Sequence, residues 1–265
     1  MKLVIHIGHG KTGSSSIQKT LLQHTAELSK QGIKYLGLML ENASNPHRKA
    51  WQRNSGSDQY FDKTSSEEAN AQLLEVLSEE ISALQSEGFS CAIWSNEWLA
   101  TRGRHVLPAL SVLKSRGIDI EVQCYVRRHD EWAQSAYLQW GVKHKSYEGP
   151  LRDFESWLPV FGQRDFRFGP SLRSWNDVFG TRLRVFNYDN LGDVVEHFLT
   201  SNNISDLTVA QDNITPDSIF LAAQAVFNSR SRNRVYPTEF ASISRILRKY
   251  DQNNTVLPEL DKLTP

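Results

Sequence analysis

The chain has 265 residues, which is enough for one large α/β domain or two small ones with a substantial buried core. Its 30 Lys and Arg residues balance its 30 Asp and Glu residues, so no net field attracts a polyanion and a nucleic-acid partner is disfavoured. No apolar run approaches the roughly 18 residues of a membrane span, and the start, MKLVIHIG, lacks the pattern of a signal peptide, so we expect neither.

The predicted elements alternate between strands and helices along the chain. Apolar runs of strand length are followed by stretches with helical spacing of apolar residues, such as the one that Ser65 or Ser66 caps and Gly88 stops. Because parallel strands need crossover connections, this alternation predicts an α/β fold with a central parallel sheet flanked by helices. In chain order we expect a strand at 4–8, a helix at 14–30, a short strand or turn at 32–37, a helix at 67–87, a strand at 89–97, a helix at 104–115, a strand at 119–126, helices at 130–144, 151–161 and 172–179, a strand at 181–188, and helices at 193–200, 216–228 and 238–250.

No internal repeat is visible, and no linker separates two cores. We therefore predict a single domain over residues 1–265 with a helical C-terminal third. In the strand at 181–188, Leu183, Val185 and Tyr188 are expected to be partly buried.

The two cysteines, Cys91 and Cys124, each lie in an apolar run with strand character. Two buried thiols are typical of a reducing compartment, so we expect a cytoplasmic protein. Neither the cysteines nor the histidines have the spacing of metal ligands, so we expect no metal site.

A glycine loop, HIGHGKTGSSS, connects the first strand to the first helix. Such a loop presents unpaired backbone N–H groups and the positive end of a helix dipole to an anion. The Walker A pattern requires Gly, four residues, Gly, Lys and then Ser or Thr. Gly8 and Gly13 have that spacing, but Ser14 stands where the lysine is required and Lys11 comes three positions early, so the loop does not fit an ATP site.

The string KTGSSS, residues 11–16, resembles the 5′-phosphosulfate loop of the PAPS-dependent sulfotransferases, commonly written Lys-[Ser/Thr]-Gly-Thr-Thr. The resemblance implies a P-loop-like three-layer fold, with PAPS as co-substrate and no metal. It implies that Lys11 reaches the oxygen between the phosphate and the sulfuryl group. The 5′-phosphate would be held by backbone N–H groups of this loop and by serine hydroxyls, with a candidate set of Thr12, Gly13, Ser14, Ser15 and Ser16. An exposed lysine beside a glycine turn is the alternative interpretation of this string taken alone.

A second constellation lies at YVRRHDEWAQS. In open parallel sheets ligands bind outside the carboxyl ends of the strands, where Arg127 is expected. The 3′-phosphate motif of the same family has an arginine that ends a strand and a serine eight residues later, a spacing that Arg127 and Ser135 share. A guanidinium fork and a hydroxyl suit a phosphate. His129 stands where many family members have proline, which resembles the bacterial form of the motif.

Sulfuryl transfer requires a base that takes a proton from the acceptor. Glu97 follows a predicted central strand in SNE, which resembles the Ser-Ser-Glu string of bacterial and glycan sulfotransferases, and we predict it as the base. His9, inside the glycine loop, is the competitor, and His47 is a weaker one. A capping or surface glutamate is the alternative for Glu97.

The polar stretch 41–66 is expected to resist regular structure and is our candidate for an acceptor-side lid, because loops of this length are usually functional or mobile. Arg230, Arg232 and Arg234 lie between two predicted helices; they could contact the 3′-phosphate, bind an anionic acceptor or form a solvated loop. Trp51, Trp98, Trp132 and Trp140 could border an acceptor cleft or pack in the core.

The resemblance favours a sulfotransferase of the bacterial type that moves a sulfuryl group from PAPS to a small-molecule or glycan acceptor. The acceptor group would be a hydroxyl or an amine, on a carbohydrate or glycoconjugate. Two alternatives stay open: a P-loop kinase or NTPase, and a non-catalytic nucleotide- or glycan-binding module on the same fold. The sequence gives no indication of the oligomeric state.

Overall fold

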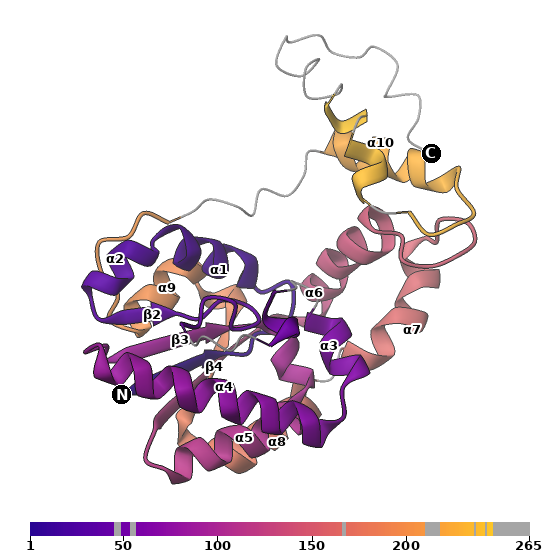
Figure 1. Cartoon of the computed structure of the whole chain (residues 1–265). Helices are drawn as coiled ribbons and strands as arrows, with labels where there is room; N and C mark the ends of the chain where they lie inside the picture. The colour runs from indigo at the N-terminus through magenta and orange to yellow at the C-terminus, as the bar shows by residue number, and fades with distance from the viewer. Residues whose placement is uncertain are drawn as a thin grey trace. The chain divides into compact units, whose positions relative to one another are not determined.

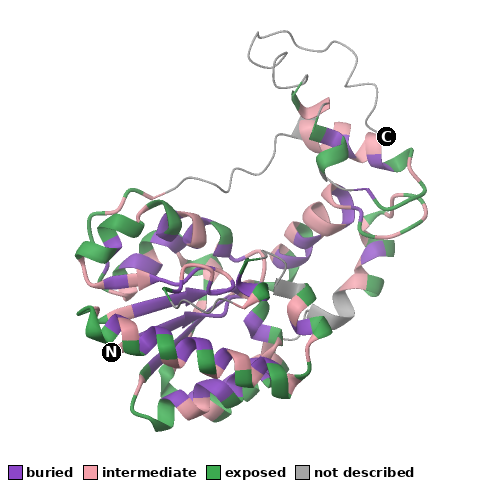
Figure 2. Ribbon diagram, in the orientation of Figure 1, coloured by how far each residue is buried: buried purple, intermediate pink, exposed green. Residues whose placement is uncertain are grey.

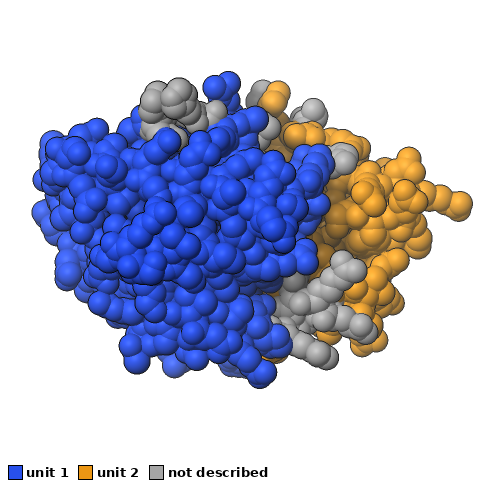
Figure 3. Space-filling view, turned by 60° about the horizontal axis from the view of Figure 1, so that its bottom comes forward, with its two compact units in different colours: residues 1–128, 167–213 blue, residues 129–166, 214–265 orange. Residues whose placement is uncertain are grey.

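The computed structural model describes residues 1–44, 49–53, 57–165, 168–209, 218–235, 237–241 and 243–245. The chain divides into two compact units (Figure 3). Unit 1 comprises residues 1–128 and 167–213, and unit 2 comprises residues 129–166 and 214–265. The single domain predicted from the sequence thus holds two such units, and each is described by itself.

Unit 1 is built around a five-stranded sheet with the strand order β2-β3-β1-β4-β5, in which every pair is parallel (Figure 1). The central strand is β1, whose last residue, His6, pairs with Ser95 of β3 and Gln123 of β4. The α/β fold predicted from the alternating pattern is confirmed. The strands are β1 Lys2–His6, β2 Ile33–Tyr35, β3 Cys91–Ser95, β4 Asp119–Val126 and β5 Leu183–Asn187.

Helices cover both faces of this sheet and give three layers (Figure 1). Side chains alternate along β1, so Leu3 and Ile5 enter one apolar cluster while Val4 enters the other. Buried residues concentrate in the sheet and on the helix sides that face it (Figure 2). The first face carries α4 Ser66–Ser86, α5 Gly103–Ser115 and α8 Phe168–Phe179, and the second carries α1 Ser14–Gln23, α2 Thr25–Lys30 and α9 Val194–Ser201.

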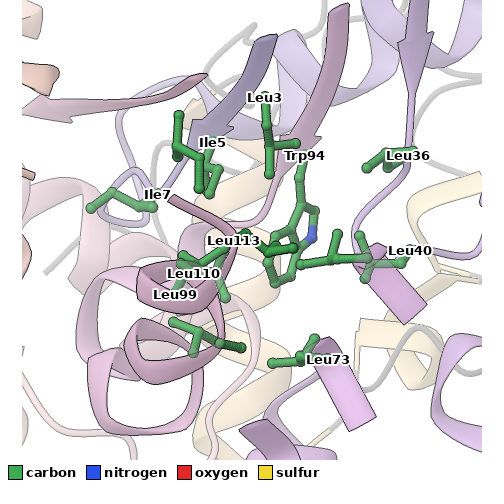
Figure 4. Packing of buried hydrophobic residues seen from close by; sticks show 14 of the residues in the cluster. Leu3, Ile5, Ile7, Leu36, Leu40, Leu73, Trp94, Leu99, Leu110 and Leu113 are labelled. Carbon is green, nitrogen blue, oxygen red and sulfur yellow. The ribbon is translucent and has the colours of Figure 1, made fainter. Parts of the chain in front are cut away.

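The first of these clusters forms the larger core (Figure 4). Leu3, Ile5 and Leu110 are completely buried in it, and burying one such side chain stabilises the fold by roughly 1.5–3 kcal/mol. Trp94 brings a polar atom into this core, and its indole N–H donates to the Leu38 carbonyl at 2.9 Å. The buried polar group is therefore satisfied, and the ring contributes its full apolar surface.

The helix predicted at 14–30 is two helices that meet at His24. The backbone of His24 has φ −112° and ψ 30°, which interrupts the helix between α1 and α2. Its Nε2 lies 2.9 Å from the Thr208 carbonyl oxygen, so a contact from a distant segment holds the break.

The prediction that 41–66 resists regular structure is wrong for part of its described residues. A 3₁₀ helix, η1 Ala50–Arg53, and α3 Ser57–Lys63 lie within it. Two aromatic anchors explain the order: Phe61 is buried, and the Trp51 indole donates to Gln72 of α4 at 2.6 Å. The Trp51 ring also stacks on Tyr60, with the ring centroids 4.9 Å apart. His47 lies outside the described residues.

The edge strand β5 corrects a burial prediction. Leu183 and Tyr188 are partly buried as expected, but Val185 is 46% exposed. An edge strand pairs with one neighbour only, so its side chains have fewer partners on each face.

Unit 2 is helical in its described part and is held together by aromatic rings. Trp157 is buried and stacks on Phe161 at 4.5 Å between ring centroids, and Phe161 stacks on Trp140 at 5.3 Å. The elements are α6 His129–Ala136, the π-helix η3 Tyr137–Lys143, α7 Phe154–Asp165, α10 Ser218–Ser229 and the 3₁₀ helix η6 Pro237–Phe240.

The helix predicted at 130–144 is therefore α-helical only as far as Ala136. At Gly141 a Cβ atom would lie 2.4 Å from Tyr137 Cδ2, so the π-helix brings its backbone against a ring that only glycine tolerates. The helix predicted at 238–250 begins in η6, and its residues 242 and 246–250 lie outside the described residues. Among the residues that are described, no helix combines the length and the apolar character needed to cross a membrane.

Candidate functional site

The candidate site lies at the carboxyl end of the central strands of unit 1. The chain leaves β1 toward β2 on one side of the sheet and leaves β4 toward β5 on the other, as the strand order shows. Open α/β sheets bind ligands outside the carboxyl ends of the strands at such a reversal. The glycine loop follows β1 directly, and Arg127 follows β4 directly.

Two glycines give the loop its path. Gly13 has φ +80°, and a Cβ atom there would lie 2.4 Å from Val194 Cγ1 at the start of α9. Gly8 is constrained by space alone, because its Cβ would lie 2.8 Å from Ser14 Oγ and 2.9 Å from His6 Nε2. Lys11, with φ +72°, adopts the left-handed region without being glycine. The loop is thus a specific, strained structure rather than a generic turn.

The loop ends at the first turn of α1. Gly13 is the N-cap residue, and its carbonyl accepts from the backbone N–H groups of Ser16 and Ile17. Gly13 has no side chain that could cap this helix, and the first turn holds no acidic residue. The positive end of α1 is therefore available to an external anion.

Buried polar atoms surround the loop. Ser14 is 4% exposed and its Oγ has no hydrogen-bond partner among the described residues; the same holds for His9 Nε2. Buried polar atoms are nearly always paired in folded proteins, so unpaired ones at a helix start indicate a place for a ligand. The Thr12 hydroxyl, by contrast, donates to the His9 carbonyl at 2.5 Å and is used within the loop. Ser15 is exposed and Ser16 is buried.

His9 is the candidate base inside the loop. Its ring lies against Phe168 with 4.6 Å between centroids, and it is 6% exposed. Burial lowers the pKa of His9 to about 4, so the imidazole is neutral at pH 7. The neutral ring can accept a proton, but its low pKa makes it a weak base.

Glu97, the other candidate base, begins the 3₁₀ helix η2 Glu97–Thr101 just beyond β3. Its Oε2 accepts from Gln18 Nε2 at 2.7 Å, and the same nitrogen lies 3.3 Å from the Ser95 carbonyl oxygen. Because Gln18 belongs to α1, this contact links the candidate base to the helix that ends the glycine loop. The structure thus brings the predicted loop and Glu97 into one neighbourhood of unit 1.

Arg127 is held in place at the end of β4. Its Nε donates to Asp189 Oδ1 at 3.2 Å, and its guanidinium lies over the Tyr188 ring at 5.3 Å from the centroid. Asp189 Oδ2 accepts from the backbone N–H of Arg128 at 2.6 Å, so one carboxylate fixes both the side chain and its strand end. Ser135 lies half-buried on α6, which belongs to unit 2. Its pairing with Arg127 stays a prediction.

Four residues near the site were not predicted from the sequence: His6, Gln18, Tyr188 and Asp189. Gln18 had a detectable signal, because it lies four residues after Ser14 and therefore on the same side of α1. Asp189 had none, because its contact with Arg127 joins residues 62 positions apart. His6 was assigned only to the strand.

The arginine cluster of unit 2 is exposed at Arg230, Arg232 and Arg234. Its backbone is tied to the preceding loop: the Arg232 carbonyl accepts from the Gly149 N–H at 2.8 Å, and the buried Lys145 amine donates to the Asn233 carbonyl at 2.6 Å. These bonds order the loop, and its three predicted roles stay open. Within the described ranges, no group of three or more His, Cys, Asp or Glu side chains is placed to hold a metal ion.

Comparison with known proteins adds no family: no family model matches the chain, and no curated protein matches its sequence.

Proposed function

We propose that the chain is a PAPS-dependent sulfotransferase that moves the sulfuryl group to a hydroxyl or amine of an acceptor, on a carbohydrate or glycoconjugate. The observation that carries the proposal is the start of α1 behind Lys11, where Gly13 offers no side-chain cap and the buried Ser14 Oγ beside Gly8 has no hydrogen-bond partner among the described residues. Helix N–H groups and a buried hydroxyl suit phosphate oxygens. A phosphosulfate carries a sulfuryl group beyond its phosphate. The amine of a lysine that precedes the helix suits the oxygen that joins these two groups.

Arg127 supports the same proposal. The family distinguishes its donor from other adenine nucleotides by a 3′-phosphate, and a guanidinium fork suits that group. A guanidinium has five N–H donors in a planar fork, and the bond from Nε to Asp189 uses one of them and orients the fork. The ring of Tyr188 restricts the fork further.

In the proposed reaction Glu97 accepts the proton of the acceptor O–H or N–H group as that atom forms its bond to sulfur. The bond between sulfur and the bridging oxygen breaks, and 3′,5′-ADP leaves. Lys11 stabilises the negative charge that develops on the leaving oxygen, an effect typically worth about 2.7–4 kcal/mol for one well-placed donor. Gln18 holds the Glu97 carboxylate in place.

Ligand binding separates this proposal from a kinase or NTPase. We expect 3′,5′-ADP to raise the melting temperature of the protein more than AMP or ATP, because a ligand that binds only the folded state stabilises it. Lys11→Ala and Arg127→Ala should reduce the shift with 3′,5′-ADP. Lys19→Ala on α1 and Arg128→Ala beside Arg127 are matched controls and should keep it. Stabilisation by ATP alone, or an unchanged shift in Arg127→Ala, would contradict the proposal.

Turnover separates the enzyme from a non-catalytic binding module. With PAPS and a panel of saccharide, phenol and amine acceptors, we expect release of 3′,5′-ADP that depends on the acceptor. Glu97→Gln should lower kcat by about 10²–10⁴-fold, the usual contribution of general base catalysis, while 3′,5′-ADP still binds. If His9→Gln abolished turnover and Glu97→Gln did not, His9 would be the base.

A further inference from the structure

The inference concerns His6, a histidine beneath the glycine loop. It is completely buried at the end of β1, and its Nδ1 lies 2.8 Å from Ser95 Oγ on the neighbouring strand β3. Its ring packs edge-on against Tyr125 at 5.5 Å and against Phe198 at 5.6 Å between centroids. Contacts from β3, β4 and α9 therefore determine where both ring nitrogens lie.

The second ring nitrogen faces the loop. His6 Nε2 has no hydrogen-bond partner among the described residues, and neither has Ser14 Oγ. Both atoms lie within 3 Å of the point that a Cβ on Gly8 would occupy, at 2.9 Å and 2.8 Å respectively. Two unsatisfied buried atoms thus border the same small space at the start of α1. A phenylalanine would pack between the same rings without an unpaired ring nitrogen, although the Ser95 hydroxyl would lose its bond to Nδ1, so ring packing alone does not explain a histidine here.

The protonation state of the ring limits what it can do. Burial lowers the pKa of His6 to about 3, so the ring is neutral at pH 7 and carries a single N–H. If Ser95 donates its hydroxyl proton to Nδ1, that N–H is on Nε2 and faces Ser14.

We propose that His6 is a positioning residue for the anion bound at the glycine loop. Ser95 donates to His6 Nδ1, His6 Nε2–H donates to Ser14 Oγ when the anion is bound, and the Ser14 hydroxyl is thereby directed at an anion oxygen. The proposal rests on the proposed function only in that the loop binds the 5′-phosphate group of 3′,5′-ADP. This series of hydrogen bonds transfers no proton. It orients the Ser95 hydroxyl toward His6 and the Ser14 hydroxyl toward the anion.

A double-mutant cycle tests the proposal with 3′,5′-ADP as the probe and calorimetry as the measurement. Ser14→Ala is expected to weaken binding about tenfold or more, as for the loss of a hydrogen bond to a charged group. His6→Phe should weaken it by a similar factor in the wild-type background and have little effect in the Ser14→Ala background. His6→Gln, which keeps an N–H donor near the Nε2 position, should restore most of the affinity. If the affinity losses of the two single variants multiplied in the double variant, the two residues would act independently and the proposal would be wrong.

A spectroscopic measurement on the unaltered protein avoids the risk that a buried variant does not fold. We expect the ¹⁵N resonances of the His6 imidazole to show an unprotonated Nδ1 and a protonated Nε2, and the Nε2 resonance to move when 3′,5′-ADP is added. His105, equally buried in unit 1 but packed against Phe61, is the control and should not move. A protonated Nδ1 overturns the proposal. Absence of any 3′,5′-ADP binding would overturn the proposed function as well. Binding of 3′,5′-ADP with independent affinity losses in the double-mutant cycle would overturn only the role of His6.

Discussion

The two units are stabilised by different kinds of core. Unit 1 buries aliphatic side chains such as Leu3, Ile5 and Leu110 between a parallel sheet and its helices. Unit 2 has a chain of stacked rings in which the buried Trp157 contacts the partly buried Phe161, which in turn contacts the partly buried Trp140. Aliphatic residues that alternate along a strand fill the interfaces between the sheet and its helices in unit 1, whereas stacked rings fill the space between helices in unit 2.

The difference matters for the candidate site. The glycine loop, Glu97 and Arg127 all belong to the sheet unit, where backbone pairing fixes the strand ends. Of the site residues predicted from the sequence, Ser135 is the one that belongs to unit 2. The following predictions test how each unit is stabilised and what holds the candidate site residues of unit 1 in place.

The largest expected effect comes from emptying either core. Trp94→Ala in unit 1 and Trp157→Ala in unit 2 each remove a side chain that is 1% exposed, and each should lower the free energy of unfolding by about 3–5 kcal/mol. Hydrogen exchange should show faster exchange mainly within the unit that carries the substitution, because each ring packs within its own unit. Equal acceleration of the β1 amides by both variants would mean that the units unfold as one.

The next largest loss of stability is expected when glycines with positive φ are replaced by alanine. Gly13→Ala should cost about 2–4 kcal/mol, because the strain of φ +80° is added to the contact with Val194. Gly149→Ala in unit 2 has φ +94° but no atom within 4 Å of its Cβ, so strain alone, about 1–2 kcal/mol, is expected. Urea denaturation measures both. A cost for Gly149→Ala as large as that for Gly13→Ala would show that close packing at the loop is unimportant.

The acid sensitivity of unit 1 follows from Glu121. Burial by itself raises the pKa of this carboxyl, but hydrogen bonds from Gln123, Lys2 and Arg184 outweigh it and lower the pKa from 4.5 to about 2. A depressed pKa stabilises the fold above pH 4.5, and this contribution is lost as the pH falls toward 2. Glu121→Gln should therefore destabilise the protein by roughly 2–3 kcal/mol at pH 7 and progressively less in acid. Thermal unfolding at several pH values measures this, and a difference that stayed constant with pH would contradict it.

The smallest effect concerns the contact between α1 and the candidate base. Gln18→Leu removes the donor to Glu97 and should lower kcat by about 3–10-fold, the usual effect of one hydrogen bond, with the KM for PAPS nearly unchanged. Gln23→Leu, at the exposed end of α1, is the control and should behave as the wild type. An unchanged kcat in Gln18→Leu would show that Glu97 is oriented by its own backbone alone.

The order of the strands in unit 1, and of its helices apart from α3 and the division into α1 and α2, was predictable from the sequence alone. Alternation along β1 and the capped, Gly-terminated helix α4 are local patterns that survive in the folded chain. The candidate phosphate loop was equally local, because Gly8, Lys11, Gly13 and Ser14 owe their relation to spacing within a few residues. The local predictions failed at His24, whose ring contacts a distant carbonyl, and after Ala136, where a π-helix replaces the α-helix.

The partners of the site residues depended on the tertiary structure. Sheet register places Ser95 beside His6, a helix packed across the sheet edge places Gln18 beside Glu97, and the end of β5 places Asp189 beside Arg127. These pairs are separated by 89, 79 and 62 positions, respectively. Spacing in a single sequence specifies neither register nor loop path, because both are decided by the packing of all the strands at once. The sequence by itself thus predicted which groups form the candidate site, and the fold decided which side chains hold each of them in place.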